Sequence, residues 1–375
     1  MELFLDTLKK EEKITLSLRK LFEQLGYKKY RMSKFESYDL YAENKSFLTS
    51  ENIITFTDVN GRLLALKPDV TLSIVKNTNA DKLNSQKLYY LENVYRLSRR
   101  NNEYKEINQM GLEYLGDVDL YTIIEVIRLA IKSLCKINDH FILDISHMGF
   151  VSSLINSLQV EAQSKTALMN CISSKNAHEL REITQKLGVS QFYQEKLIAI
   201  CSLYGDFEKT LQAAQEIVIN DQMQEALTEL EELYKAISFS KFSQNLQLDF
   251  SIINDIDYYS GIIFQGYVEK IPHAVLTGGR YDNLMKKFGK DIGAIGFAIY
   301  LNMLEQYCKE TPDYDIDSLV LYDQDTDFGK MSCAILKMIE GGQSVRTEKF
   351  IPAELRYKKL YRYRDGKMTE VTDHA

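Results

Sequence analysis

The chain of 375 residues contains no tryptophan and only four prolines, so it has little room for proline-rich linkers. It also lacks any apolar run approaching the roughly 20 residues that a membrane-spanning helix needs. Its first twenty residues alternate acidic and basic side chains at close intervals. This pattern excludes a secretory signal peptide and an Arg-rich, acid-poor transit peptide. We therefore expect a cytoplasmic protein that does not engage a membrane.

Cysteine and histidine are both scarce, with five residues of each. The cysteines have no CxxC spacing, which argues against a zinc site and favours reduced, mostly buried thiols. We expect no metal and no cofactor. The five cysteines are Cys135, Cys171, Cys201, Cys308 and Cys333.

Basic charge is not in excess either, because the formal net charge is −7. Proteins that live on nucleic acid usually present a basic face that displaces phosphate counterions. Overall acidity makes such a face less expected without forbidding it. The basic clusters, each also compatible with an ordinary solvated surface, are Arg96 with Arg99-Arg100, and Lys358-Lys359 with Arg362 and Arg364.

Periodicity predicts most elements of the first half of the chain. Apolar residues recur at helical spacing over 2–25, and Gly26 stands where a helix would stop. Asn60-Gly61 predicts a hairpin between strands 53–56 and 63–66. Pro68 opens a helix over 69–76. Further predicted elements are strands 88–95 and 109–115, a helix over 119–135 with its N-cap region at 117–122, and strand 140–145.

Strand patterns disappear between about 150 and 236, which predicts an inserted helical domain. They return at 246–250 and 261–268, followed by predicted helices 281–288 and 295–308. A linker near 311–313 precedes a tail with strand 318–322, helix 328–339 and strands 343–349 and 358–363. This order predicts an α+β protein. Its expected parts are a core over 1–149 and 246–310, a helical insertion over 150–245, and a small α/β extension over 311–375.

Four stretches, in order, resemble the signature segments of histidyl-tRNA synthetases. They are Leu66-Lys-Pro-Asp-Val-Thr71; Asn93-Val-Tyr-Arg96 with Glu106-Ile-Asn-Gln-Met-Gly-Leu-Glu113; Asp257-Tyr-Tyr-Ser-Gly261; and Gly278-Gly-Arg-Tyr-Asp282 with Gly293-Ala-Ile-Gly-Phe-Ala-Ile-Tyr-Leu301. The resemblance covers about residues 1–308. It implies the fold of a class II aminoacyl-tRNA synthetase, with an antiparallel sheet as its core.

The resemblance also implies a pocket for free histidine. An α-ammonium needs carboxylate and carbonyl acceptors, and an imidazole needs an acceptor for its N–H. By motif matching, Asp69, Thr71 and Gln109 would hold the ammonium, while Glu113 and Tyr259 would face the imidazole. Gln109 and Glu113 share one face of a predicted strand, and so do Asp257 and Tyr259. Residues completing the implied site are Arg96, Tyr258 and a loop of Gly278, Gly279 and Arg280.

The chain departs from the synthetases where ATP would bind. The third family motif ends in Gly-Leu-Glu-Arg, but the matching residues here are Tyr300-Leu-Asn-Met303. Met303 replaces the arginine for the γ-phosphate and Asn302 the metal-side glutamate. Ser98 replaces a glutamate, and Asn254 replaces the arginine expected at the substrate carboxylate. Losing one oriented group at a developing charge costs about 3–4 kcal/mol, so several losses predict no adenylate formation.

About 60 residues after the linker are too few for the full anticodon-binding domain of a synthetase, so we expect no tRNA partner. The pattern resembles the regulatory subunits of ATP phosphoribosyltransferase. That resemblance implies a non-catalytic chain, dimeric with itself and joined to a short-form catalytic subunit in a hetero-octamer. Histidine would be the feedback effector of the first step of histidine biosynthesis. The alternatives are a divergent histidyl-tRNA synthetase and another amino-acid ligase or binding module on the same fold.

Overall fold

The computed structural model describes residues 8–44, 52–98, 102–238, 242–253, 258–307 and 313–371. The chain divides into two compact units, Met1–Cys308 and Lys309–Ala375. Each unit combines helices with a sheet, which confirms the predicted α+β class. The finer division of the first unit into core and insertion stays a prediction.

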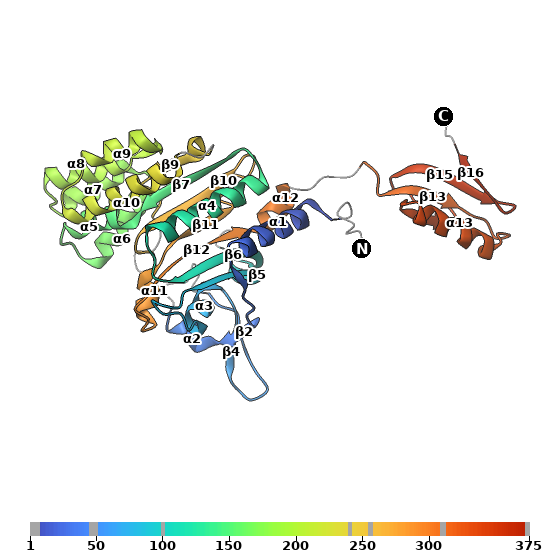
Figure 1. The fold of residues 1–375 in the computed structure, drawn as a ribbon, viewed down its shortest axis with the longest axis horizontal. Coiled ribbons are helices and arrows are strands. Elements are labelled where there is room, and N and C mark those ends of the chain that lie inside the picture. The colour runs from blue at the N-terminus through green and yellow to red at the C-terminus, as the bar shows by residue number, and fades with distance from the viewer. Residues whose placement is uncertain are drawn as a thin grey trace. The chain divides into compact units, whose positions relative to one another are not determined.

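A nine-stranded sheet forms the centre of the larger unit (Figure 1). Its neighbouring strands are antiparallel except for two parallel pairs, β1 with β5 and β7 with β9. This confirms the predicted sheet type. In spatial order the strands are β1 (Lys28–Lys29), β5 (Gln86–Leu97), β6 (Tyr104–Gly116), β12 (Gly293–Tyr300), β11 (Leu276–Arg280), β10 (Ile262–Val268), β7 (Phe141–His147), β9 (Leu246–Asp249) and β8 (Tyr204–Asp206).

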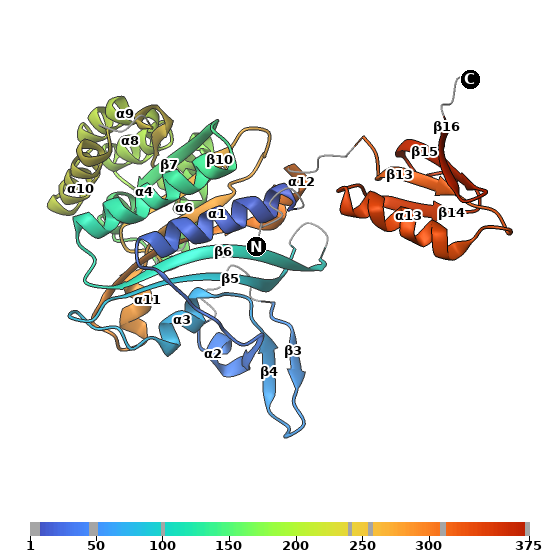
Figure 2. The same cartoon turned by 45° about the vertical axis from the view of Figure 1, so that its right-hand side comes forward.

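Two long helices, α1 (Lys10–Gln24) and α4 (Leu120–Ile137), pack side by side on one face of this sheet (Figures 1 and 2). Both are amphipathic, so burying their apolar sides against the strands forms the main hydrophobic core. Gly26, with φ +83°, ends the chain's first helix at the predicted place. Asp119 caps α4 by accepting from Thr122 N at 2.8 Å, as the sequence predicts.

The opposite face carries the short helices α3 (Thr71–Asn77) and α11 (Asp282–Lys287). Beside them lie α2 (Tyr38–Ala42) and a three-stranded sheet, which extends as a hairpin away from the body of the unit (Figure 2). The hairpin confirms the prediction from Asn60-Gly61, and Gly61 has φ +78°. The strands are β2 (Phe35–Ser37), β4 (Leu63–Leu66) and β3 (Thr55–Thr57).

Helices dominate the segment after β7, as predicted. The segment does contain one strand, β8, which pairs with β9 at the edge of the large sheet, so the expectation of no strand there was wrong. Only three residues form it, too few for an alternating pattern. The helices are α5 (Met148–Asn156), α6 (Ala162–Ser173), α7 (Ala177–Lys186), α8 (Gln191–Ile200), α9 (Phe207–Gln215) and α10 (Asp221–Ile237), followed by a 3-10 turn, η3 (Ser243–Asn245).

Three local predictions in the last part of the sheet were wrong. The predicted helix 295–308 is strand β12 up to Tyr300, and α12 (Leu301–Tyr307) begins only afterwards. A central strand buried on both faces has no alternation, so periodicity alone cannot separate it from a buried helix. Gly278-Gly279-Arg280 belongs to strand β11 and not to a loop. Conversely, residues 258–260 are not in a strand.

The smaller unit has a four-stranded sheet in the order β14-β13-β15-β16. Strand β13 (Ile316–Leu321) is parallel to β14 (Val345–Glu348) and to β15 (Tyr357–Arg364). An antiparallel hairpin joins β15 to β16 (Lys367–Val371), and α13 (Phe328–Glu340) packs on one face. Strands β13, β14 and β15 and helix α13 lie close to the predicted positions, whereas β16 was not predicted.

Candidate functional site

The side chain of Glu113 lies at the centre of a polar cluster on the α3 face of the large sheet. Only 2% of Glu113 is exposed. Thr71 Oγ1 donates to its Oε1 at 2.8 Å, and Tyr281 Oη donates to its Oε2 at 2.6 Å. Burial outweighs these two hydrogen bonds and, with the nearby Asp69 charge, raises the pKa of Glu113 to about 8. The site therefore offers a buried carboxyl group that a cation would ionise.

The predicted motif around Pro68 supplies the next residues of the site. Asp69 accepts from the backbone N–H of Leu72 at 2.9 Å, in the first turn of α3. Arg96, on β5, lies 3.4 Å from the other carboxylate oxygen and donates through Nε to the Pro68 carbonyl at 2.7 Å. Burial raises the pKa of Asp69, and Arg96 opposes the shift. Arg96 thus fixes the turn that presents Asp69 and Thr71.

Three tyrosines surround this carboxyl pair. The rings of Tyr258 and Tyr259 are 4.5 Å apart, and Tyr258 lies 5.8 Å from Tyr281, measured between ring centroids. Burial raises the pKa of all three phenols, with Asp69 or Glu113 contributing in each case. The phenols therefore stay protonated, so they can donate hydrogen bonds and offer aromatic faces to a planar ligand.

Glycines allow the strands to approach the cluster. A Cβ on Gly296 would overlap the Glu113 carboxylate, and one on Gly279 would come within 2.6 Å of the Tyr259 ring. Gly278, the neighbouring strand residue, points the other way, toward Phe264 and Phe297 in the main core. Of the two glycines predicted to lie near the pocket, Gly279 faces the tyrosines and Gly278 does not.

Arg280, the last residue of β11, links the large sheet to the helical segment. Its Nε donates to Asp282 at 2.8 Å, and its Nη1 lies 3.7 Å from Glu229 Oε1 on α10. His147 Nε2 is 2.7 Å from the other oxygen of Glu229. Because Gly149 N–H donates to Nδ1 of His147, the Nε2 atom carries the proton and donates. His147, Gly149 and Glu229 border a cavity of about 780 Å³ that also reaches Ser260.

The region matched to the ATP site of synthetases has a different character. Gln109, predicted to hold the ammonium of histidine, is buried on β6 and lies opposite Tyr300 in the β6–β12 ladder. The Tyr300 hydroxyl is 3.0 Å from Thr277 Oγ1. Met303, at the position of the phosphate-binding arginine, packs against the main hydrophobic core, and Asn302 Oδ1 is buried without a partner among the described residues. The side chains at these positions do not supply the cation that the ATP phosphates require.

The structure thus brings together most of the predicted site residues. Tyr281 is an addition to the predicted set, because it stands within the fourth signature segment but no role was predicted for it. The contact of Glu229 with His147 and Arg280 had no sequence signal, since it joins segments about 50 to 80 residues apart. Asn254 and Asp257 lie outside the described residues, as does Cys308. The predicted ligand roles stay predictions.

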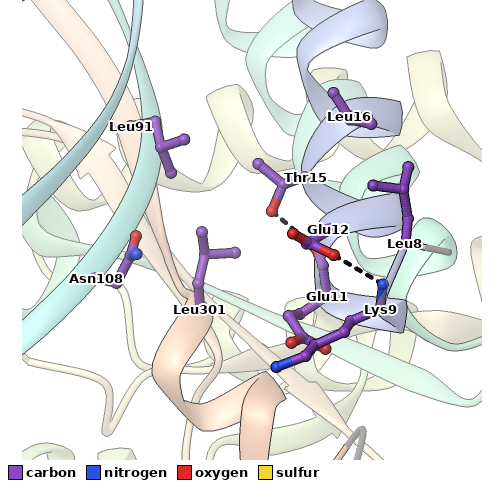
Figure 3. A pocket seen from close by; sticks show the side chains of 9 residues that line it. All are labelled: Leu8, Lys9, Glu11, Glu12, Thr15, Leu16, Leu91, Asn108 and Leu301. Atoms are coloured by element: carbon purple, nitrogen blue, oxygen red, sulfur yellow. Dashed lines mark hydrogen bonds between the residues drawn. The ribbon is translucent and has the colours of Figure 1, made fainter. Parts of the chain in front are cut away.

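A separate cavity of about 510 Å³ lies on the opposite face of β5 and β6 (Figure 3). Leu91 and Asn108 border it from these strands, with Leu301 from α12 and residues from the start of α1 completing the wall. Asn108 projects from the other side of β6 than Gln109 does. This cavity is therefore distinct from the cluster around Glu113.

Within the ranges given above, four cysteines are free thiols, namely Cys135, Cys171, Cys201 and Cys333. No group of three or more His, Cys, Asp or Glu side chains in this part of the chain could hold a metal ion. None of the helices described combines the length and the apolar character required to cross a membrane.

Comparison with known sequences identifies the family. The histidyl-tRNA synthetase profile matches residues 2–304. A protein of Oceanobacillus iheyensis called ATP phosphoribosyltransferase regulatory subunit is 31% identical, over 79% of this chain and 73% of its own length. A protein of the same description from Clostridium acetobutylicum is 30% identical, over 89% of this chain and 84% of its own length.

Solved structures show the same fold. A Bacillus halodurans structure described as ATP phosphoribosyltransferase regulatory subunit/histidyl-tRNA synthetase has a TM-score of 0.73 at 24% identity, covering 90% of this chain and 88% of that one. A chain in the ATP phosphoribosyl transferase (HisG:HisZ) complex of Thermotoga maritima has a TM-score of 0.60 at 17% identity, covering 77% and 96%. By its sequence this chain belongs to the family of ATP phosphoribosyltransferase regulatory subunits, and its fold is that of histidyl-tRNA synthetases.

Proposed function

We propose that this chain is the non-catalytic regulatory subunit of an ATP phosphoribosyltransferase and that free histidine binds around Glu113. The observation that carries the proposal is the buried Glu113 carboxyl with Thr71, Asp69 and the tyrosines around it. A cationic amino group or a protonated imidazole would ionise this carboxyl and replace the water lost on burial. The tyrosine faces suit a planar imidazole ring.

The adjoining region supports a role without amino-acid activation. Adenylate formation builds charge on the ATP phosphates, and enzymes of this fold class meet that charge with arginines and Mg²⁺. Here Met303 packs into the apolar core, and Tyr300 occupies a position that is glycine in the synthetases. The side chains that would bind an amino acid are therefore present, whereas the phosphate-binding arginine is replaced.

Feedback control requires histidine to bind two states of the assembly with different affinities. The ion pair between Arg280 at the end of β11 and Glu229 on α10 offers a route for this coupling. A shift of the end of β11 on histidine binding would move α10 through this pair. We place the catalytic activity on a separate short-form partner subunit. A self-dimer of this chain within a hetero-octamer completes the proposed assembly.

The test uses the purified chain alone and with the catalytic subunit of the same organism. Alone, it should show no histidine-dependent exchange of pyrophosphate into ATP. Added to the partner, it should raise phosphoribosyl transfer and make that activity sensitive to histidine. Pyrophosphate exchange at synthetase-like rates would refute the proposed role and favour a divergent ligase. Phosphoribosyl transfer that is the same with and without the added chain would also refute it. Sedimentation of the mixture tests the octamer separately.

A further inference from the structure

The smaller unit contains a cavity whose lining is basic although the whole chain is acidic. Its volume is about 220 Å³. Three cationic side chains line it, Lys349, Arg362 and Arg364, against one carboxylate, Asp323. Two residues of the basic cluster seen in the sequence, Arg362 and Arg364, thus line one cavity. An ordinary solvated surface does not account for this grouping.

The cavity lies where parallel sheets commonly bind ligands. Lys349 follows the end of β14, Tyr322 and Asp323 follow the end of β13, and Arg362–Arg364 end β15. These three strands are parallel neighbours, so their carboxyl ends meet at one edge. The chain leaves β13 for β14 on one side and returns at β15 on the other. Such a reversal of strand order opens a crevice at the carboxyl edge.

The charged side chains that line the cavity differ in whether they already have a partner of opposite charge. Asp323 Oδ1 accepts from Thr326, and its Oδ2 lies 3.5 Å from Arg364 Nε. By contrast, Lys349 and Arg362 form no ion pair with the carboxylates of the described residues. The cavity therefore keeps two positive charges that lack a protein counterion in this part of the chain.

We infer that the cavity lined by Lys349, Arg362 and Arg364 binds a single phosphate group of a small phosphorylated molecule. Arg362 would grip two phosphate oxygens through its planar fork, and Lys349 would add a point charge. The volume exceeds the ~30 Å³ of one water severalfold but is below the 300–1,000 Å³ typical of larger ligands. It suits one phosphate with its nearest waters.

A nucleic-acid strand fits this surface less well. Strand binding requires a row of free cations that follows successive phosphates. Several neighbouring cations are already paired, Lys359 with Glu370, Arg346 with Glu348, and Arg356 with Asp315. One isolated basic hollow with paired surroundings favours a small anion. This inference does not depend on the proposed role of the larger unit.

The experiment is calorimetric titration of the full chain, in chloride buffer of low ionic strength, with inorganic phosphate and with a nucleoside 5′-monophosphate. The double variant Lys349→Gln with Arg362→Gln removes the two unpaired charges at exposed positions. Lys358→Gln is the matched control, because it removes an exposed cation of the same strand outside the cavity.

We expect saturable binding of at least one of the two phosphates, weakened at least about tenfold in the double variant and unchanged in the control. Saturation by inorganic phosphate alone would identify the free ion as the ligand, whereas tighter binding of the nucleotide would identify a phosphomonoester. The inference is overturned if neither compound saturates, or if the double variant binds like the control. Tight binding of an RNA oligonucleotide that Lys358→Gln weakens equally would also overturn it.

Discussion

Thr71, the first residue of α3, donates its hydroxyl hydrogen to Glu113 on strand β6, with 2.8 Å between the two oxygens. The bond joins the turn after Pro68 to the middle of the large sheet. It also commits one oxygen of the carboxyl group, while Tyr281 commits the other. A ligand cation must therefore approach a carboxyl whose position is already fixed on both sides, which is the condition for a preorganised site.

We predict that Glu113→Ala weakens histidine binding by about 10- to 100-fold, because a charged hydrogen bond contributes about 1.5–3 kcal/mol. Calorimetric titration with histidine measures the affinity, and inhibition of the assembled transferase measures its consequence. Glu125→Ala is the control. Glu125 lies outside the cluster around Glu113 and accepts a hydrogen bond from Lys87 Nζ at 2.7 Å. Equal affinity in wild type and Glu113→Ala would place the effector elsewhere, such as at the subunit interface.

The buried carboxyl also predicts how stability depends on pH. In the unfolded chain Glu113 has a pKa near 4.5, and burial raises it to about 8 in the folded protein. Between these values the folded state holds a proton that the unfolded state has released. The contribution of Glu113 to the unfolding free energy therefore falls as pH rises from about 4.5 to about 8.

Glu113→Gln should remove this decline, because the amide has no proton to lose in that range. Denaturant midpoints for the larger unit, taken at several pH values across the range, test it. The variant should gain stability relative to the wild type as the pH increases. Parallel pH profiles for the two proteins would contradict a raised pKa at Glu113.

Local sequence patterns predicted some elements of the fold correctly and missed others. Asn60-Gly61 and Asp119 act through their nearest neighbours, so local chemistry predicted the hairpin and the helix cap correctly. Residues 295–300 form a strand buried on both faces, and a buried apolar run looks the same whether its partners are strands or helices. The pairing of His147 with Glu229 depends on how separate segments pack, which no local pattern encodes.

The same distinction applies within the pocket. The motifs around Thr71 and Glu113 could be matched to a family, and they do meet in space. The direction of Gly278 could not be known before the register of β11 was fixed, because a shift of one residue reverses every side chain of a strand. Tyr281 follows the same register and gains its role from the bond to Glu113.

We predict that Glu229→Ala loosens the attachment of α10 to the core, since it removes the acceptor of His147 and the partner of Arg280. The loss should be about 1–2 kcal/mol, as for a part-buried hydrogen bond with one partner left unsatisfied. Hydrogen exchange of the α10 amides, together with thermal unfolding, measures it. Glu225→Ala, at an exposed position one turn earlier in the same helix, should behave like the wild type. Equal exchange rates in the two variants would show that Glu229 does not hold the helix.

Gly296 provides the most stringent test of the geometry around Glu113. It lies opposite Glu113 in the β6–β12 ladder, and a Cβ there would overlap both the carboxylate and the carbonyl oxygen of Leu112. Separating the paired strands β6 and β12 to make room for a methyl group would break hydrogen bonds in the centre of the sheet. We therefore predict that Gly296→Ala lowers the free energy of unfolding by about 3 kcal/mol or more and abolishes histidine binding. Thermal unfolding and calorimetric titration measure the two effects.

Removing the carboxylate as well, in the double variant Gly296→Ala with Glu113→Ala, should restore only part of the stability, since the overlap with the Leu112 carbonyl persists. Gly329→Ala in α13 is the control, because its new methyl group would meet no atom closer than 3.4 Å, to Asp327 Oδ1. A Gly296→Ala protein that folds and binds histidine like the wild type would mean that β12 does not lie against Glu113. Full rescue by the double variant would instead place the whole conflict at the carboxylate and free the strand backbone from it.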